Sequence, residues 1–153
     1  MVIAKKRNGM RSEKLIKIIK DMEVSISNLK EGKNILKETD DKKTAIFIEY
    51  GLRYILVDSF ITVENFTSIM LKELKKFKIG IDMRDSLEIL KENNVLNEEE
   101  YLFLNEARLL RNRISHRYKE PSREELLEFI EGNIDKFDYV LNEAKGVLNR
   151  TIQ

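Results

Sequence analysis

The sequence predicts an all-α protein, an up-and-down bundle of four to five helices. Proline occurs once and glycine six times in 153 residues, so few positions would interrupt a helix. Charged residues make up 36% of the chain, and isoleucine and leucine are plentiful and recur at helical spacing. A chain of this length fits one domain. We expect this domain at residues 12–150, after a flexible basic lead-in at residues 1–11.

The first helix is predicted to begin at Ser12, because serine is a favoured N-cap residue. Apolar residues follow at helical spacing from Leu15 to Leu29. Gly32 is expected to end this helix, since glycine readily adopts the left-handed conformation that closes helices. The prediction is therefore an amphipathic first helix with a lysine-rich outer face.

The segment from Thr44 to about Phe77 is the most apolar part of the chain and is far too long for a strand. Its apolar residues cover more than one stripe of a helix, and such a helix must be buried on most sides. We therefore predict a long central helix that contacts both its own bundle and a second subunit. Within it, Glu49 and Arg53 are expected to form an ion pair four residues apart.

Three further helices are predicted from their capping residues. The N-terminal signals are Asp82 for a short third helix, Asn97 with Glu100 for the fourth, and Ser122 with Glu125 for the last. The fourth helix is expected to run to just before Pro121, because proline disfavours helical geometry in the residue that precedes it. The last helix carries apolar residues at helical spacing as far as Val147.

The candidate functional residues gather in the segment 111–118, Arg-Asn-Arg-Ile-Ser-His-Arg-Tyr, which includes the only histidine of the chain. Between positions 108 and 123 there is one acid, Glu120, against six basic residues: Arg108, Arg111, Arg113, Arg117, Lys119 and Arg123. A group that titrates near neutrality beside a positive patch suits a polyanion. The net charge of +1 does not by itself indicate such a partner, whereas this local cluster does.

Two opposite faces are predicted for the fourth helix. The packing face contains Phe103, Ala107, Leu110, Ile114 and Tyr118, and the second face contains Leu102, Asn105, Leu109, Asn112 and His116. We expect the second face at a dimer seam, together with the long central helix. Arg111 and His116 diverge by about 140° on the helix, so one protomer would struggle to bring both to one phosphate. Two such helices that meet across a twofold axis could do so.

These residue types suit cleavage of RNA without a metal ion or another cofactor. Histidine can take or give a proton near pH 7, arginine can bind a phosphate through two hydrogen bonds, and asparagine can orient the imidazole. Asp58 could face Arg111 or His116 as a supporting acid, although a pairing with a lysine at the rim is its more ordinary role. The plain alternative for the whole set is a helix-end histidine beside solvated arginines.

The composition excludes several other kinds of site. The chain has no cysteine, which rules out disulfides, thiolate metal sites and cysteine nucleophiles. With a single histidine, a zinc site of the usual ligands would need a partner subunit. No secretory signal and no run of about 20 apolar residues is present, so we expect a cytoplasmic protein without a membrane partner.

The order of Arg111, Asn112, His116 and Tyr118 resembles the signature of the HEPN superfamily, and especially its HepT branch. The residues that lead up to it, from Asp85 through the turn at positions 91–94, are similar to the usual approach in that family. The likeness covers about residues 44–145. Ser115 is a mild departure, because a small apolar residue is common there in the family.

This resemblance implies a HEPN bundle that dimerises so that both motifs line one cleft. It further implies a metal-independent endoribonuclease, the toxin of a toxin–antitoxin pair, in which Arg111 and His116 are catalytic and Asn112 supports them. The implied partner is a minimal nucleotidyltransferase antitoxin of the MntA type, which would neutralise the toxin by transferring AMP to Tyr118. The additional basic residues, which we expect to bind RNA, are Arg108, Arg113, Arg117 and Lys119.

Two other functions remain open at this point. The same basic cleft could hold a nucleotide or a small phosphorylated substrate, in which case the chain would be the non-catalytic HEPN subunit of a two-component nucleotidyltransferase. A purely structural helical dimer would instead bind neither nucleotide nor RNA.

Overall fold

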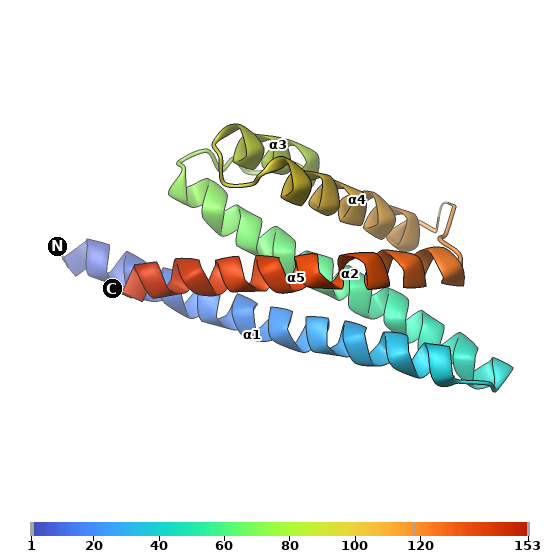
Figure 1. The fold of residues 1–153 in the computed structure, drawn as a ribbon. Helices are drawn as coiled ribbons and strands as arrows, with labels where there is room; N and C mark the ends of the chain where they lie inside the picture. Colours follow the sequence, from blue (N-terminus) through green and yellow to red (C-terminus); the bar gives the residue numbers. More distant parts are fainter. Residues whose placement is uncertain (1, 118, 153) are drawn as a thin grey trace.

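The computed structural model of the chain contains five α-helices, which are α1 (Val2–Glu38), α2 (Lys42–Glu73), α3 (Met83–Glu92), α4 (Glu98–Ser115) and α5 (Arg123–Ile152) (Figure 1). The structure describes the backbone of residues 2–117 and 119–152, and the side chains of residues 11–117 and 119–151. No strand occurs within these ranges. The prediction of an all-α bundle is therefore confirmed.

The long helix α2 lies at the centre of the bundle. It contacts α1 along much of its length, and it also contacts α3, α4 and α5. In Figure 1, α3 and α4 lie together on the half of α2 that is nearer its C-terminus, while α5 runs alongside α1. The predicted central position of this helix within its own bundle is confirmed. None of the helices in the described part of the chain has the long apolar stretch that crossing a membrane would require.

One continuous apolar core joins all five helices. Its largest fully buried side chains include Leu15 and Met22 of α1, Phe60 of α2, Leu87 of α3 and Phe103 of α4. Phe103 lies edge to face against Phe137 of α5, with ring centroids 5.0 Å apart. Because burial of each such side chain contributes roughly 1.5–3 kcal/mol, this core is the main source of stability.

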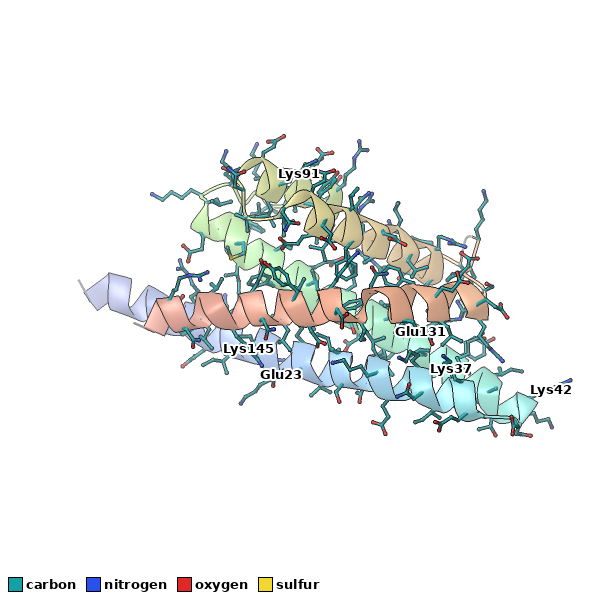
Figure 2. All side chains as sticks on the ribbon, in the orientation of Figure 1. Glu23, Lys37, Lys42, Lys91, Glu131 and Lys145 are labelled. Atoms are coloured by element: carbon teal, nitrogen blue, oxygen red, sulfur yellow. The ribbon has the colours of Figure 1, made fainter. Side chains whose placement is uncertain are left out.

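Ion pairs connect α1 with α5 at the surface of the bundle (Figure 2). Lys145 Nζ lies 2.9 Å from Glu23 Oε1, and Lys37 Nζ lies 2.5 Å from Glu131 Oε1. Exposed pairs of this kind contribute about 0–1 kcal/mol each, so they favour the alignment of the two helices more than they stabilise the fold.

The predicted helix starts of α3, α4 and α5 are confirmed by hydrogen bonds of their caps. Asp82 accepts a hydrogen bond from the N–H of Asp85 at 2.8 Å. Asn97 and Glu100 form a complete capping box, with bonds of 2.8 and 3.3 Å. Ser122 and Glu125 form the second one, with bonds of 3.1 and 3.4 Å. Each cap satisfies N–H groups that would otherwise be unpaired.

The predicted ion pair within α2 is also confirmed. Arg53 Nη2 lies 3.2 Å from Glu49 Oε2. The structure adds a third member that the sequence did not indicate, because Arg123 Nε donates to the other oxygen of Glu49 at 2.6 Å. Burial opposes ionisation of Glu49, but its bonds to the two arginines hold its pKa below the usual value.

The predicted bounds of the first helix are wrong at both ends. The helix does not begin at Ser12 but at Val2, so it covers most of the expected lead-in, and it continues beyond Gly32 to Glu38. No proline lies between residues 2 and 38, and one glycine within a helix costs only about 1 kcal/mol. Gly32 instead marks a close approach of α1 and α2, since a Cβ atom there would lie 3.1 Å from Leu52 Cδ1.

Candidate functional site

His116 lies at the C-terminal end of α4. Its backbone N–H donates to the carbonyl of Asn112 at 3.0 Å, which makes it the C-cap of the helix, and its side chain is exposed. Within the ranges that the structure describes, the imidazole makes no hydrogen bond or ion pair. The ring is therefore open to a ligand that approaches from solvent.

The predicted continuation of α4 to Pro121 is wrong, because the helix ends at Ser115. Arg117 follows the cap with φ of 52°, and Lys119 has φ of 49°, so both residues adopt the left-handed conformation. This conformation costs a residue with a side chain roughly 1–2 kcal/mol, and strain of this kind clusters at functional sites. Tyr118, which was expected on the packing face of this helix, lies outside the described residues.

Arg111 points from α4 towards α2. Its guanidinium forms an ion pair with Glu64, and its Cζ lies 5.2 Å from the centroid of the Phe60 ring. Its side chain is 25% exposed, and its Nε is buried without a hydrogen-bond partner among the described residues. The guanidinium is thus held between an acid and an aromatic ring, and the exposed quarter of the side chain is the part that an anion from outside could reach.

The predicted supporting role of Asp58 is wrong. Its carboxylate accepts a hydrogen bond of 2.7 Å from Ser25 Oγ, so it connects α2 with α1 rather than with the motif. The acid that does contact Arg111 is Glu64, six residues further along α2. Six residues correspond to a turn of about 120° around the helix, which explains why only one of the two acids can face α4.

Arg113 connects the end of α4 with the start of α5. Its Nε donates to the carbonyl of Lys119 at 2.7 Å, and Nη1 and Nη2 donate to the two carboxylate oxygens of Glu125 at 2.8 and 3.3 Å. This pair lowers the pKa of Glu125 and raises that of Arg113. Arg113 was predicted to bind RNA, but its described contacts hold the connection between the two helices, which begins with His116.

Arg108, Asn112 and His116 form a row on one flank of α4, because each lies four residues beyond the previous one. Arg108 donates to Asn105 Oδ1 from Nε at 3.1 Å and from Nη2 at 2.8 Å. An amide does not neutralise a guanidinium, so Arg108 keeps its positive charge beside Asn112 and His116. Asn112 is half-buried. The positive charge of Arg108 therefore lies beside the predicted neighbours Asn112 and His116. Arg111 is not part of this row, because its side chain contacts α2.

Large apolar side chains are exposed on α2 and on the outer face of α4. On α2 they include Phe47, Tyr50, Tyr54 and Ile61, of which Tyr54 is 72% exposed. On α4 they are Leu102 and Leu109, which are 55% and 49% exposed. Both leucines belong to the second face of α4, and the dimer seam expected there stays a prediction. Apolar surface of this extent is typical of a face that another protein covers.

Reasoning from the sequence alone missed Glu64 and Phe60 as contacts of Arg111. A signal for Glu64 was present, because an acid in so apolar a helix needs a partner. Choosing between it and Asp58 required the rotation of α2 relative to α4, which the sequence does not contain. Among the described residues, no group of three or more histidine or acidic side chains is arranged to hold a metal ion.

Comparison with known proteins gives one result. The family described as HepT-like, Ribonuclease HepT-like, matches residues 22–144, a segment that runs from the middle of α1 to near the C-terminus of α5 and includes the row on α4. No curated protein and no solved structure matches the chain.

Proposed function

Because the chain belongs to the ribonuclease HepT-like family, we propose that it is a metal-independent endoribonuclease that acts as the toxin of a toxin–antitoxin pair. The observation that supports this most directly is the pairing of two unlike groups near the end of α4. Arg111 is held against Glu64 and Phe60, and His116 is exposed about 1.4 helical turns further along the chain. One group can bind a phosphate and the other can transfer a proton.

The proposed reaction is attack of the RNA 2′-oxygen on the adjacent phosphorus atom. His116 takes the proton of the 2′-hydroxyl as the bond between the 2′-oxygen and phosphorus forms. The bond between phosphorus and the 5′-oxygen breaks, and the leaving oxygen takes up a proton from solvent. Arg111 stabilises the charge on the non-bridging oxygens, Asn112 orients the imidazole, and Arg108 with Arg117 and Lys119 bind flanking phosphates.

A second protomer is proposed to complete the cleft. Arg111 faces α2, whereas His116 belongs to the row on the other flank of α4, so we pair Arg111 of one protomer with His116 of the other. The exposed apolar residues of α2 and α4 supply a surface that such a dimer would bury. Their burial would contribute through the hydrophobic effect in the same way as the core of each protomer.

The proposed partner is a minimal nucleotidyltransferase antitoxin of the MntA type, which would transfer AMP to Tyr118. This residue lies between Arg117 and Lys119 and two positions after His116. A phosphate attached there would pair with the basic side chains that an RNA phosphate must reach, and its negative charge would repel RNA. The modification would therefore suppress cleavage without unfolding the protein.

The function is tested by incubating the purified protein with single-stranded RNA in excess EDTA. We expect cleavage products with 2′,3′-cyclic phosphate ends, because the proposed reaction needs only side chains of the protein. The products are identified by mass spectrometry. Cleavage that appears only when a divalent metal ion is added would contradict the mechanism, and no cleavage under either condition would contradict the function.

The connection made by Arg113 leads to a second expected result. The variant Arg113→Ala should cleave RNA about tenfold more slowly. It loses the hydrogen bonds to the Lys119 carbonyl and to Glu125, so the C-terminal end of α4 and with it His116 are positioned less precisely. Its unfolding free energy should fall by no more than about 1 kcal/mol, since the pair with Glu125 is exposed. Trypsin should also cut after Arg117 or Lys119 faster than in the wild type. Arg84→Ala, which removes an exposed pair with Glu88 in α3, serves as the matched control.

A further inference from the structure

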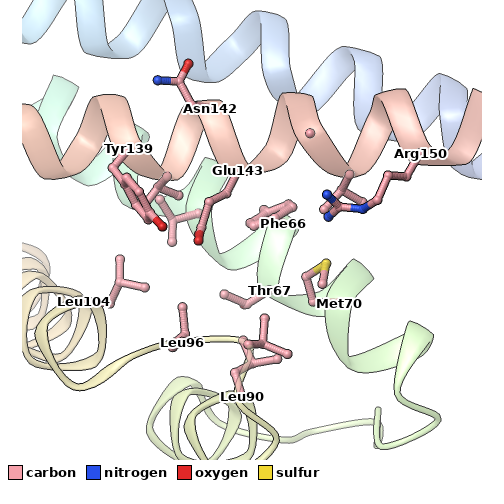
Figure 3. A pocket seen from close by; sticks show the side chains of 15 residues that line it. Phe66, Thr67, Met70, Leu90, Leu96, Leu104, Tyr139, Asn142, Glu143 and Arg150 are labelled. Atoms are coloured by element: carbon pink, nitrogen blue, oxygen red, sulfur yellow. The ribbon is translucent and has the colours of Figure 1, made fainter.

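A pocket of about 530 Å³ opens between α2, α3, α4 and α5 (Figure 3). None of its lining residues belongs to the segment 111–118. Its walls are mainly apolar and include Val63, Phe66, Met70, Leu90, Leu104 and Val147. This volume and this composition are typical of sites that bind small molecules. The pocket is therefore a second candidate site, distinct from the one on the end of α4.

Most of the polar side chains that line the pocket belong to α5, and Thr67 of α2 is the other one. Tyr139 and Glu143 lie four residues apart on this helix, and Figure 3 shows both side chains directed into the pocket. Arg150 lies about two turns further along, at the exposed rim. Gly146, between Glu143 and Arg150, lines the mouth of the pocket without a side chain, and a Cβ atom there would lie 3.6 Å from Arg150 Nη1.

The carboxyl group of Glu143 interacts with that of Glu100 in α4. One oxygen of Glu100 accepts the capping bond from the N–H of Asn97 at 3.3 Å. The other, Oε2, is buried, and it has no hydrogen-bond donor among the described residues unless Glu143 is protonated. A buried acceptor without a donor costs about 1–3 kcal/mol, and such groups in folded proteins call for an explanation.

The two carboxyl groups lack a cation of their own. Burial, followed by the charge of Glu100, raises the pKa of Glu143 to about 7. The charges of Glu143 and Glu100 raise the pKa of Tyr139 as well. A hydrogen bond from the Tyr139 hydroxyl and, more weakly, the charge of the exposed Arg150 side chain lower the pKa of Glu143, but burial and Glu100 outweigh both. A positive group with N–H donors would supply what this end of the pocket lacks.

We propose that this pocket binds a small molecule with an apolar body and a single positively charged amine. The body displaces water from Phe66, Met70 and Leu104, while the amine donates hydrogen bonds to Glu143 and to the unpaired oxygen of Glu100. The ring of Tyr139 adds a face or an edge against which the ligand packs. Arg150 repels the amine at the opposite end, so only one orientation of the ligand is favoured.

Three indole compounds of similar size test this proposal at pH 8, where Glu143 is largely ionised. They are tryptamine, which carries an amine, indole-3-ethanol, which is neutral, and indole-3-propionate, which is an anion. By titration calorimetry, tryptamine should bind at least about tenfold more tightly than the other two. Equal affinities, preference for the anion, or no binding of tryptamine at millimolar concentration would each overturn the proposal.

Two variants and a control connect the binding to the pocket. Glu143→Gln should weaken tryptamine at least about tenfold, because it removes the negative charge and its amide N–H can occupy the Glu100 oxygen that the amine would reach. The affinity for indole-3-ethanol, which carries no positive charge, should change little. Gly146→Leu should abolish tryptamine binding by filling the mouth, and it should keep the fold because leucine favours helix more than glycine does. Glu106→Gln, an exposed acid of α4 that does not line this pocket, should bind like the wild type. Unchanged binding in both pocket variants would overturn the assignment.

Discussion

The variant His116→Ala is expected to cleave RNA at least about a hundredfold more slowly than the wild type, since a side chain that transfers a proton contributes 10²–10⁴-fold. Its stability should change little, because the ring is exposed and the capping N–H of residue 116 is retained. Only the interaction with the helix dipole is lost, about 0.3–1 kcal/mol. Single-turnover cleavage in EDTA and urea unfolding measure the two quantities. Cleavage at the wild-type rate would contradict the catalytic role.

A mixing experiment extends this prediction to the composite cleft. If Arg111 of one protomer acts with His116 of the other, a hybrid of Arg111→Gln and His116→Ala protomers holds one intact site and one empty site. Random reassociation makes about half of the dimers hybrids, so the mixture should recover roughly a quarter of the wild-type activity. A mixture no more active than its separate components would show that both groups must come from the same protomer.

The starts of α3, α4 and α5 could be predicted because they depend on local chemistry. Asp82, Asn97 and Ser122 each accept a hydrogen bond from a backbone N–H three residues later, so the signal and the structure lie within the same four residues. Helix ends were predicted less well. Two positions after the last residue of α2 and of α4 there is a basic residue in the left-handed conformation, Lys75 and Arg117 respectively. Lysine and arginine are good helix formers, so nothing in the sequence marks them as stops.

The candidate site was predictable in its composition but not in its contacts. Arg111 and His116 could be selected because a lone titratable group within a basic cluster is visible in the sequence. The partner of Arg111 could not be selected, because Glu64 is 47 residues away and its position depends on how α2 and α4 pack. Arg113 shows the same limit: its charge predicted RNA binding, but packing places Glu125 and the Lys119 carbonyl within its reach.

The pocket acid Glu143 should make stability depend on pH in a direction opposite to that of most carboxylates. Its folded-state pKa of about 7 lies above the ordinary value of 4.5, so the folded protein keeps this proton longer than the unfolded chain does. Where the unfolded state binds fewer protons, stability falls as pH rises. The contribution of Glu143 is therefore complete below about pH 4.5 and is lost as pH rises through 7.

Glu143→Gln is expected to be more stable than the wild type at pH 8 by on the order of 1–2 kcal/mol, after allowance for solvent screening. At pH 5 the two should be nearly equal, because Glu143 is then protonated in the folded protein. The amide of glutamine can also donate an N–H hydrogen bond to the buried oxygen of Glu100. Protonated Glu143 can donate to the same oxygen through its O–H, whereas the ionised carboxylate has no donor. Urea unfolding at pH 5, 6, 7 and 8 measures the difference, with Glu106→Gln as the control. Parallel pH profiles for wild type and Glu143→Gln would contradict the raised pKa, because only a group that titrates differently in the folded and unfolded states can separate the two curves.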